Sequence, residues 1–363
     1  MVGQIVSVVG ARPNFMKMAP LYKEIKNNGY EQILIHTGQH YDENMSKIFF
    51  TDLEIPMPDI NFNIGSGSHA NQTAKIMIKF EEFCLKNKPS LVIVFGDVNS
   101  TVACSLVCAK MGIKIAHVES GLRSGDKTMP EEINRIITDQ LSDILFTPSI
   151  GANNNLLNEG IDASKIFFVG NIMIDSLMNN FDKIKKSNIL NELEISSKNY
   201  ALLTLHRPGN VDKKSNLQSL MEIISIISKD IQIIFPVHPR THNSFDDKLH
   251  EIINESNIKI CPPLGYIDFI HLMNCSKFVM TDSGGIQEET TALNIPCLTL
   301  RENTERPVTI EKGTNTLVKF DANEIKDAVD DILINGGKNG LIPDLWDGKT
   351  ANRILEIIQS MKL

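Results

Sequence analysis

The sequence lacks a long apolar run and lacks a basic excess. A membrane-spanning helix needs about 20 consecutive apolar residues, and no run in this chain is that long. The formal net charge at pH 7 is -8, whereas a general nucleic-acid-binding protein needs a basic face for the phosphate backbone. These two absences exclude a helical membrane protein and a general nucleic-acid binder. They leave open a local basic pocket for one small anion.

The sequence also lacks a Cys-x-x-Cys pair, although it contains six cysteines. Most of them stand in apolar runs, which is typical of free thiols in a reducing compartment and not of a disulfide framework or a zinc site. The six are Cys84, Cys104, Cys108, Cys261, Cys275 and Cys297. Met1 leads into a strand-like run without a basic leader, so we expect a cytoplasmic protein.

Several cofactor signatures are missing as well. The turn after the first apolar run has one glycine, Gly10, where a dinucleotide-binding fingerprint needs three. The next run ends in His36 and offers no acid for the ribose of NAD. The chain has no Walker loop, no metal-binding triad and no cysteine nucleophile with a paired base. We therefore expect no cofactor and no metal.

The chain instead alternates between short apolar runs and helix-period segments. The run Leu91–Phe95 is uninterrupted and rich in β-branched residues, which is typical of a strand buried on both faces of a parallel sheet. At 363 residues the chain is too long for one ordinary core. The pattern therefore predicts an α/β protein with two Rossmann-like, doubly wound domains.

The expected elements can be placed along the chain. Strands are expected over residues 4–9, 33–35, 91–95, 114–118, 144–147, 200–204, 231–236, 258–261, 278–281 and 297–300. Helices are expected over residues 15–26, 44–52, 71–86, 100–111, 131–142, 322–333 and 350–361, and a loop over 55–68. We expect a first domain over residues 1–170, a second over 171–348, and a C-terminal helix (349–363) that packs back on the first.

Residues 278–289 carry the clearest site. An apolar run leads into Asp282, Ser283, Gly284 and Gly285, and a helix-like segment follows. The first turn of a helix has free N–H groups and the positive end of the helix dipole. Adjacent glycines let an anion approach the backbone, so the stretch predicts a phosphate seat. A plain strand–turn–helix connection with an N-cap remains the alternative.

Other polar residues stand at expected strand ends. Asp97 and Glu119 follow two successive buried strands. Because ligands of open parallel sheets bind outside the carboxyl ends of the strands, both acids are candidates for a cleft. Arg12 and Lys17 are five residues apart at an expected helix start. Both could reach an anion there, although each alone could be a surface cation. His206, beside Arg207, is a candidate for acid/base chemistry or anion binding.

Taken in order, the motifs resemble one family. The motifs are Gly10-x-Arg12-Pro-x-x-x-Lys17, Thr37-Gly-Gln39-His40, Gly96-Asp97, His117-Val-Glu119-Ser-Gly121-Leu-Arg123, Pro130-Glu131-Glu132-x-Asn134-Arg135, His206-Arg207, Pro236-Val-His238, Thr281 to Glu289, and Thr304-Glu305-Arg306-Pro307. The set, which covers nearly the whole chain, is similar to that of the non-hydrolysing UDP-N-acetylglucosamine 2-epimerases. The resemblance implies two domains that face each other across a cleft, as in GT-B glycosyltransferases, with the UDP-sugar in the cleft.

The resemblance also implies site residues and an assembly. It assigns catalytic roles to Asp97, Glu119, Glu131 and His206. It assigns substrate binding to Arg12, Lys17, Arg135, His238, Phe269 (through its backbone, to uracil), Ser283, Gly284, Gly285, Glu289 (to the ribose) and Arg306. It implies a homodimer without a cofactor that makes precursors of surface polysaccharides. From the residues alone, Glu131 and Arg135 could equally be a surface pair on one helix.

The chemistry of a 2-epimerase suits these residue types. The C2 proton of an N-acetylhexosamine has no adjacent carbonyl, so a base alone cannot remove it. If UDP leaves first, positive charge at C1 acidifies that proton, and elimination gives a glycal with a C1–C2 double bond. Re-addition of UDP with protonation from the other face gives the epimer. The reaction needs cations and a helix N-terminus for the diphosphate and carboxylates for proton transfer.

Two positions depart from the family pattern, and other functions stay open. Asp42 and Asn71 stand where many bacterial members have Gln and Arg for an activating second substrate site. The resemblance therefore does not carry that site over. The region around Gln39 and the segment 206–212 also resemble epimerases of 2,3-diacetamido uronic acid sugars. A hydrolysing 2-epimerase, a GT-B glycosyltransferase and a UDP-sugar sensor are the further alternatives.

Overall fold

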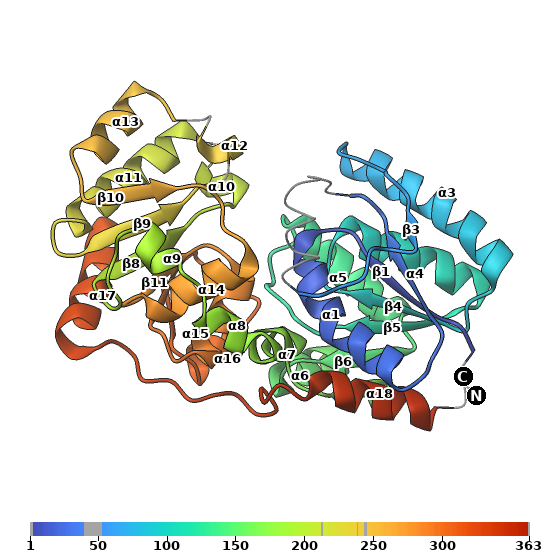
Figure 1. The fold of residues 1–363 in the computed structure, drawn as a ribbon. Helices are drawn as coiled ribbons and strands as arrows, with labels where there is room; N and C mark the ends of the chain where they lie inside the picture. Colours follow the sequence, from blue (N-terminus) through green and yellow to red (C-terminus); the bar gives the residue numbers. More distant parts are fainter. Residues whose placement is uncertain (1–2, 40–52, 212, 238, 243–244, 362–363) are drawn as a thin grey trace. The chain divides into compact units, whose positions relative to one another are not determined.

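The computed structural model describes residues 3–39, 53–211, 213–237, 239–242 and 245–361. The chain divides into two compact units. The first comprises residues 1–180 and 344–363, and the second comprises residues 181–343. Each unit is built on its own parallel sheet (Figure 1). The prediction of two doubly wound α/β domains is confirmed.

The sheet of the first unit has seven strands in the order β3-β2-β1-β4-β5-β6-β7, all parallel. The strands are β1 (Ile5–Val9), β2 (Gln32–His36), β3 (Ile60–Asn61), β4 (Leu91–Phe95), β5 (Lys114–Val118), β6 (Ile144–Thr147) and β7 (Ile166–Phe168). All five residues of β1 and of β4 are buried. Helices cover both faces of these central strands, which explains why nine of their ten residues are apolar.

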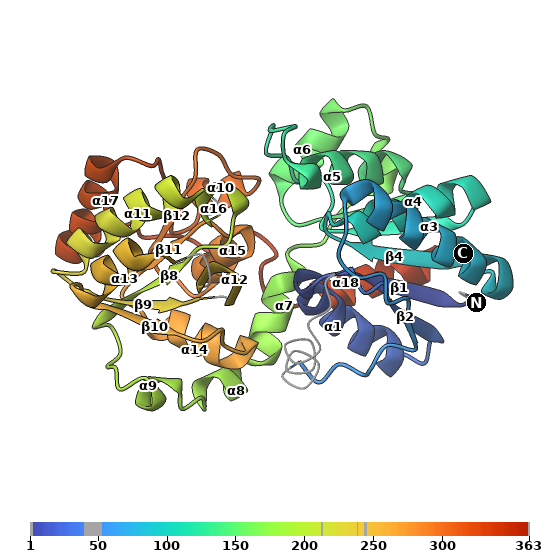
Figure 2. The same ribbon diagram turned by 90° about the horizontal axis from the view of Figure 1, so that it is seen from above.

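Two groups of helices pack on this sheet, as Figures 1 and 2 show. The helices are α1 (Arg12–Asn27), α3 (His69–Asn87), α4 (Asn99–Met111), α5 (Pro130–Leu141), α6 (Ile150–Asn158), α7 (Ile172–Asn179) and α18 (Thr350–Ser360), with a 3₁₀ turn over Ala163–Lys165. Helix α4 packs against both α3 and α5, whereas α1 packs against α7 and α18. One core cluster joins Val6, Val8, Val92 and Val94 of the sheet to residues of α3 and α4, such as Phe80.

The C-terminal helix α18 belongs to the first unit. Figure 1 shows it, in red, beside the blue α1. The indole of Trp346 donates to the Pro148 carbonyl at 3.0 Å, and the amide of Ala351 donates to Asp175 Oδ2 at 2.8 Å. Asp175 on α7 thus caps the start of α18. Because α7 packs on α1 and carries this cap, residues 171–180 lie in the first unit and not in the second, where the sequence placed them.

The sheet of the second unit has six strands in the order β10-β9-β8-β11-β12-β13, again all parallel. The strands are β8 (Tyr200–Thr204), β9 (Gln232–Pro236), β10 (Ile258–Cys261), β11 (Val279–Thr281), β12 (Cys297–Leu300) and β13 (Asn315–Val318). Its core cluster includes Leu203, Phe235, Phe278 and Met280 with residues of α11 and α17.

Ten helices accompany this sheet in the described residues. They are α8 (Phe181–Lys185), α9 (Ile189–Glu192), α10 (Pro208–Val211), α11 (Lys214–Ile227), α12 (Pro239–His242), α13 (Asp247–Asn254), α14 (Tyr266–Cys275), α15 (Gly284–Ala292), α16 (Pro307–Glu311) and α17 (Ala322–Asn335). The short helices α8 and α9 both pack against α14.

The strand order of each sheet reverses at one place. In the first sheet the reversal lies between β1 and β4, and in the second it lies between β8 and β11. Connections leave such a pair of strands toward opposite faces, which opens a crevice at their carboxyl ends. The residues that follow these four strands are therefore placed to meet a ligand, and they include Arg12, Asp97, His206 and Asp282.

Candidate functional site

In the first unit, Asn14 fixes the turn between β1 and α1. Its side-chain oxygen accepts from the amides of Gly10 and Ala11, both at 3.1 Å, and its Nδ2 donates to the Phe95 carbonyl at 2.9 Å. The turn is therefore tied to the end of the neighbouring strand β4. Arg12 is the first residue of α1, and its side chain lies outside the described part of the structure.

Lys17 and Glu119 form a buried ion pair in the first unit. Glu119 directly follows β5 and has a φ of 71°, a left-handed conformation that is uncommon for a residue with a side chain. Its amide and that of Ser120 donate to the Phe146 carbonyl at 3.1 and 3.0 Å, which holds this conformation. A Cβ at Gly96 would lie 3.0 Å from Lys17 Nζ and 3.3 Å from a Glu119 oxygen. Glycine at this position thus leaves room for the pair.

A buried histidine ties the ends of β4 and β5 together. His117 Nδ1 lies 2.7 Å from Asp139 Oδ1, and His117 Nε2 lies 2.8 Å from the Gly96 carbonyl oxygen. The second oxygen of Asp139 accepts from the Gly121 amide at 3.1 Å and lies 2.7 Å from Arg123 Nη1. Both His117 and Asp139 have fully buried side chains. The network joins the turns that carry Asp97 and Glu119.

Arg135 links two carboxylates of the first unit. Its Nη2 lies 2.6 Å from Asp97 Oδ2, and its Nη1 lies 2.6 Å from Glu132 Oε2. Glu132 is buried and also accepts from two backbone amides of the preceding loop, at 2.9 to 3.1 Å. The side chain of Asp97 keeps 26% of its surface exposed. Glu131 is exposed on the first turn of α5. Asp97 and Glu131 can therefore meet a ligand, whereas Glu132 is structural.

In the second unit, the turn between β11 and α15 leaves a helix start open. Ser283 is the N-cap of α15; its amide donates to Thr281 Oγ1 at 3.0 Å, and its hydroxyl caps no amide of the described helix. Gly284 and Gly285 form the first turn, whose N–H groups have no partner within the helix. A Cβ at Gly284 would lie 2.5 Å from Arg306 Nη1. Glycine thus lets the ends of Arg306 and Glu305 lie directly against the helix start.

Asp282 anchors the loop that carries His206. Its carboxylate is fully buried and accepts from the amides of His206, at 3.1 and 3.2 Å, and of Arg207, at 3.0 Å. Asn210 Nδ2 donates to it at 3.0 Å, and His206 Nδ1 lies 2.9 Å from its Oδ1. The His206 side chain itself is 59% exposed. Asp282 is therefore the centre of a hydrogen-bond network that the sequence did not predict.

A cluster of alternating charges lies beside the start of α15. Arg306 Nε is 2.9 Å from Glu288 Oε1, and Arg306 Nη1 is 2.5 Å from Glu305 Oε1. Arg301 Nη2 lies 2.9 Å from Glu305 Oε2, and Arg207 Nη2 lies 3.7 Å from Glu305 Oε1. The two carboxylates fix the position of the Arg306 guanidinium beside the helix start.

Glu289 is buried on α15 and is 4% exposed. Burial and the neighbouring charge of Glu288 raise the pKa of Glu289 to about 8, against the lowering effect of a hydrogen bond with Tyr266. Its Oε1 is buried without a hydrogen-bond partner among the described residues. Phe269 is half-buried on the first turn of α14, and its amide donates to the Gly265 carbonyl at 3.0 Å.

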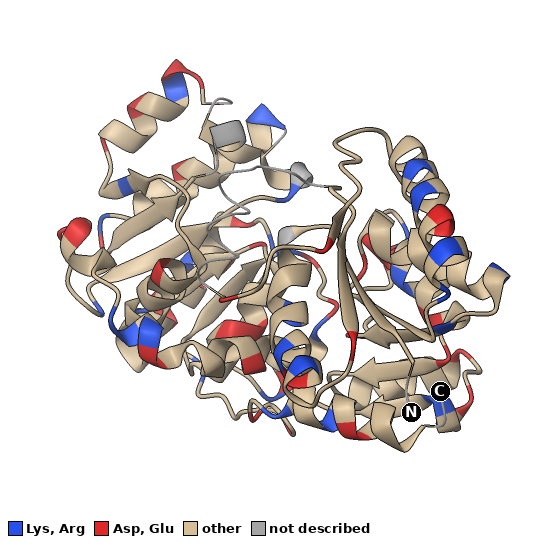
Figure 3. Ribbon diagram, turned by 45° about the vertical axis from the view of Figure 1, so that its right-hand side comes forward, with Lys and Arg blue, Asp and Glu red and all other residues tan. Residues whose placement is uncertain are grey.

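The surface charges are mixed, and a separate pocket lies elsewhere in the second unit. Figure 3 shows acidic and basic residues interspersed along the helices of both units.

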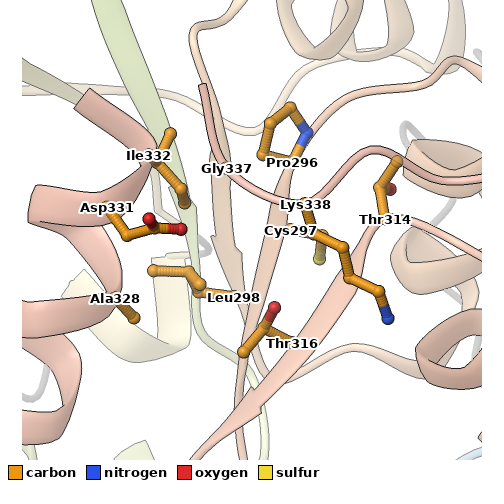
Figure 4. A pocket seen from close by; sticks show the side chains of 10 residues that line it. All are labelled: Pro296, Cys297, Leu298, Thr314, Thr316, Ala328, Asp331, Ile332, Gly337 and Lys338. Atoms are coloured by element: carbon orange, nitrogen blue, oxygen red, sulfur yellow. The ribbon is translucent and has the colours of Figure 1, made fainter. Parts of the chain in front are cut away.

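A pocket of about 140 Å³ lies between β12, β13 and α17 (Figure 4). It is lined by Pro296, Cys297, Leu298, Thr314, Thr316, Ala328, Asp331, Ile332, Gly337 and Lys338. These residues do not overlap with the predicted site residues.

Comparison with known proteins decides the family. The model of the family described as UDP-N-acetylglucosamine 2-epimerase matches residues 23–359. The chain belongs to the UDP-N-acetylglucosamine 2-epimerase family. It is 48% identical to a UDP-N-acetylglucosamine 2-epimerase homolog of Methanococcus maripaludis, across 99% of this chain and 100% of the relative. It is 44% identical to a UDP-N-acetylglucosamine 2-epimerase of Methanocaldococcus jannaschii, across 97% of both chains.

Solved structures of this epimerase family agree with the fold. The crystal structure of the Methanocaldococcus jannaschii UDP-GlcNAc 2-epimerase in complex with UDP-GlcNAc and UDP matches with a TM-score of 0.91 and 42% identity, across 99% of this chain and 100% of that one. A glycosyltransferase from Rickettsia africae matches with a TM-score of 0.57 and 17% identity, across 99% and 94% of the two chains. That likeness shows a shared GT-B-like fold alone.

The structure gathers most of the predicted residues into two groups, one in each unit. Within the first unit, Lys17 meets Glu119 and Arg135 meets Asp97. Within the second, Arg306 lies against the helix start of Gly284. His238 and Asp42 lie outside the described residues. In the described part of the chain, no helix is both long and apolar enough to cross a bilayer.

Proposed function

We propose that this chain interconverts UDP-N-acetylglucosamine and UDP-N-acetylmannosamine by inverting C2 of the sugar. The observation that carries the proposal is the likeness, at a TM-score of 0.91 and 42% identity over 99% of the chain, to an epimerase whose crystal structure holds UDP-GlcNAc and UDP. The strand-end groups of the two units supply the residue types that the reaction needs. No hydride moves in this isomerisation, so NAD has no role in it.

We assign the nucleotide to the second unit. The open start of α15, formed by Ser283, Gly284 and Gly285, offers backbone N–H groups and a positive helix end to the diphosphate. Arg306, held by two carboxylates, adds a cation at the same place. The unpartnered oxygen of Glu289 is an acceptor for a ribose hydroxyl. In this proposal Phe269 meets the uracil through its backbone.

We assign the proton transfers to the acids of the first unit together with His206. Asp97, Glu119 and Glu131 stand after β4, after β5 and on α5, and Asp97 and Glu131 retain exposed surface. UDP departs first; the charge at C1 then acidifies the C2 proton, and a positioned base removes it to give the glycal. Re-addition of UDP and protonation of the other face complete the reaction. Arg12, Lys17, Arg135 and His238 complete the proposed binding set.

A second substrate has one specific observation in its favour. The chain is 36% identical, over 99% of its length, to a UDP-2,3-diacetamido-2,3-dideoxy-D-glucuronate 2-epimerase of Pseudomonas aeruginosa. The identity to the UDP-N-acetylglucosamine 2-epimerases of Methanocaldococcus jannaschii and Methanococcus maripaludis is higher, at 44% in each case. UDP-N-acetylglucosamine is therefore the first substrate to test. We further propose a homodimer, and a cytoplasmic location in keeping with six free thiols.

One experiment separates the candidate reactions. The protein is incubated with UDP-N-acetylglucosamine in D₂O and followed by proton NMR. Epimerisation gives UDP-N-acetylmannosamine with deuterium at C2, since the removed proton exchanges with solvent. Free N-acetylmannosamine identifies a hydrolase instead. No reaction with this sugar, together with turnover of the 2,3-diacetamido uronic acid substrate, identifies the second candidate.

A further inference from the structure

The carboxylate of Asp282 makes two kinds of contact in the loop that follows β8. It accepts from the backbone amides of His206 and Arg207 and from Asn210 Nδ2. It also lies 2.9 Å from Nδ1 of the His206 imidazole. The first set of bonds shapes the loop. The contact with Nδ1 determines which nitrogen of His206 carries a proton.

Asp282 acts as an acceptor only. Burial raises the pKa of Asp282, but the hydrogen bond and charge of His206 and the bonds from Arg207 and Asn210 outweigh burial and bring the pKa below its ordinary value. Asp282 is therefore ionised at neutral pH and has no proton to donate. The short contact with Nδ1 requires that nitrogen to be the donor. The other ring nitrogen, Nε2, belongs to a side chain that is 59% exposed.

We propose that Asp282 is a positioning residue that keeps the proton of His206 on Nδ1 and leaves Nε2 as the atom that exchanges a proton with the sugar substrate. The part of this inference that concerns the sugar rests on the proposed function. The part that concerns the tautomer rests on the geometry of the loop alone. Carboxylates that orient a histidine through one ring nitrogen are a general means of preparing the other for acid/base work.

The proton balance is simple. In the neutral ring, Nε2 has a lone pair and takes up one proton from the substrate. The Nδ1–H stays bonded to Asp282, so the ring becomes an imidazolium whose positive charge faces a carboxylate. Nε2 then gives this proton to solvent, while an acid of the first unit protonates the other face of the sugar; in the reverse reaction Nε2 delivers a proton to the face from which it was taken. Asp282 remains ionised throughout, and no other reagent is needed.

The variant Asp282→Asn separates the two kinds of contact. The amide oxygen can take the place of Oδ2, which accepts from Arg207 and Asn210. The amide nitrogen then takes the place of Oδ1 and donates to His206 Nδ1. The loop keeps most of its bonds, but the ring must shift its proton to Nε2. Asn210→Ala is the matched control, because it removes one bond to the same carboxylate without changing the partner of Nδ1.

The tautomer is read directly by long-range ¹H–¹⁵N NMR of the full-length protein with ¹⁵N-labelled histidine, at pH 8, with His206→Gln to assign the signal. We expect the Nδ1–H form in the wild type and in Asn210→Ala, and the Nε2–H form in Asp282→Asn. In the D₂O assay, Asp282→Asn should lower kcat by about 10²- to 10⁴-fold, the usual share of a general acid/base. The UDP Kd should stay within about threefold, since only proton transfer is affected.

A double variant tests whether Asp282 acts through His206. If it does, Asp282→Asn combined with His206→Gln turns over no more slowly than His206→Gln alone; a merely structural role would add a further loss. An Nε2–H signal in the wild type overturns the inference, and that spectrum decides even if Asp282→Asn does not fold. A tautomer change without loss of kcat also overturns it. A wild type that shows the Nδ1–H form but no epimerisation refutes the proposed function and leaves the tautomer assignment standing.

Discussion

The pH dependence of UDP binding tests the role of Glu289. Burial, followed by the charge of Glu288, raises the pKa of this carboxyl to about 8 in the protein without ligand. At pH 7 the group is therefore mostly protonated. A ribose hydroxyl that donates to Glu289 favours the carboxylate, so that binding of UDP must release a proton.

The size of the effect follows from the two pKa values. If binding lowers the pKa of Glu289 from about 8 to about 6, linkage predicts that UDP affinity rises about 25-fold between pH 6 and pH 8. At pH 7 the same shift releases about 0.8 proton for each UDP bound. UDP affinity must rise between pH 6 and pH 8. Over this range Glu289 holds a proton in the free protein more often than in the complex, so a higher pH favours the complex.

The measurement is isothermal titration calorimetry of UDP at pH 7 in two buffers with different enthalpies of ionisation. The difference in apparent enthalpy gives the number of protons released. Glu289→Gln is the control: it cannot ionise, while the phosphate of UDP still titrates as before. Equal proton release by the wild type and by Glu289→Gln refutes the reasoning, whatever the absolute affinities are.

Four further predictions concern the two units separately. Asp97→Asn should lower epimerisation by about 10²- to 10⁴-fold and leave the UDP Kd within about threefold, as measured by kinetics and calorimetry. His117→Phe keeps an aromatic ring but removes both hydrogen bonds of the buried imidazole, and should cost about 1–3 kcal/mol in urea unfolding. The folded-state pKa of Asp175 is raised by burial, so its contribution to stability is present below the unfolded pKa and is lost as pH rises. Asp175→Asn should therefore gain stability relative to wild type on going from pH 4 to pH 8 in urea titrations. Gly284→Ala places a Cβ 2.5 Å from Arg306 Nη1 and 2.6 Å from Glu305 Oε1, so these side-chain ends must move away from the helix start, and the variant should weaken UDP binding in calorimetry.

For each of these variants, one result would contradict the prediction. A loss of UDP affinity equal to the loss of rate in Asp97→Asn would contradict a role limited to proton transfer. Unchanged stability of His117→Phe would show that the two bonds are not made in solution. A wild type and an Asp175→Asn variant with parallel pH profiles would remove the ionisation of Asp175 as a cause. Full UDP affinity in Gly284→Ala would move the diphosphate away from α15.

The fold could be predicted because the central strands carry an unmistakable signal. Strands such as Leu91–Phe95 are apolar throughout because they are covered on both faces. Three short strands escaped prediction. Strand β3 has two residues in a segment expected as a loop, β7 has only three residues, and β13 begins with the polar Asn315 and Thr316; all three lie at edges of their sheets. The expected helix over 44–52 lies outside the described residues.

The site was predictable in its residues but not in their partners. The sequence places Asp97 and Glu119 at strand ends, and strand ends of a parallel sheet share one edge. It does not reveal that Arg135 neutralises both Asp97 and Glu132, or that Asp139 supports His117, because these partners come from a helix that lies beside the strands only in the fold. The sequence shows two adjacent acids, Glu131 and Glu132, at the start of α5. Only the structure shows that Glu132 is buried and Glu131 is exposed.

The return of α18 to the first unit has a consequence for synthesis of the chain. Residues 181–343 form one uninterrupted stretch, whereas the first unit needs its closing twenty residues, 344–363, to cover α1. On the ribosome the later sheet can be finished while the earlier one still lacks its last helix. A fragment that stops near residue 343 should therefore expose the bare flank of α1 and α7, and its amino-terminal half should be the first part that proteases cut.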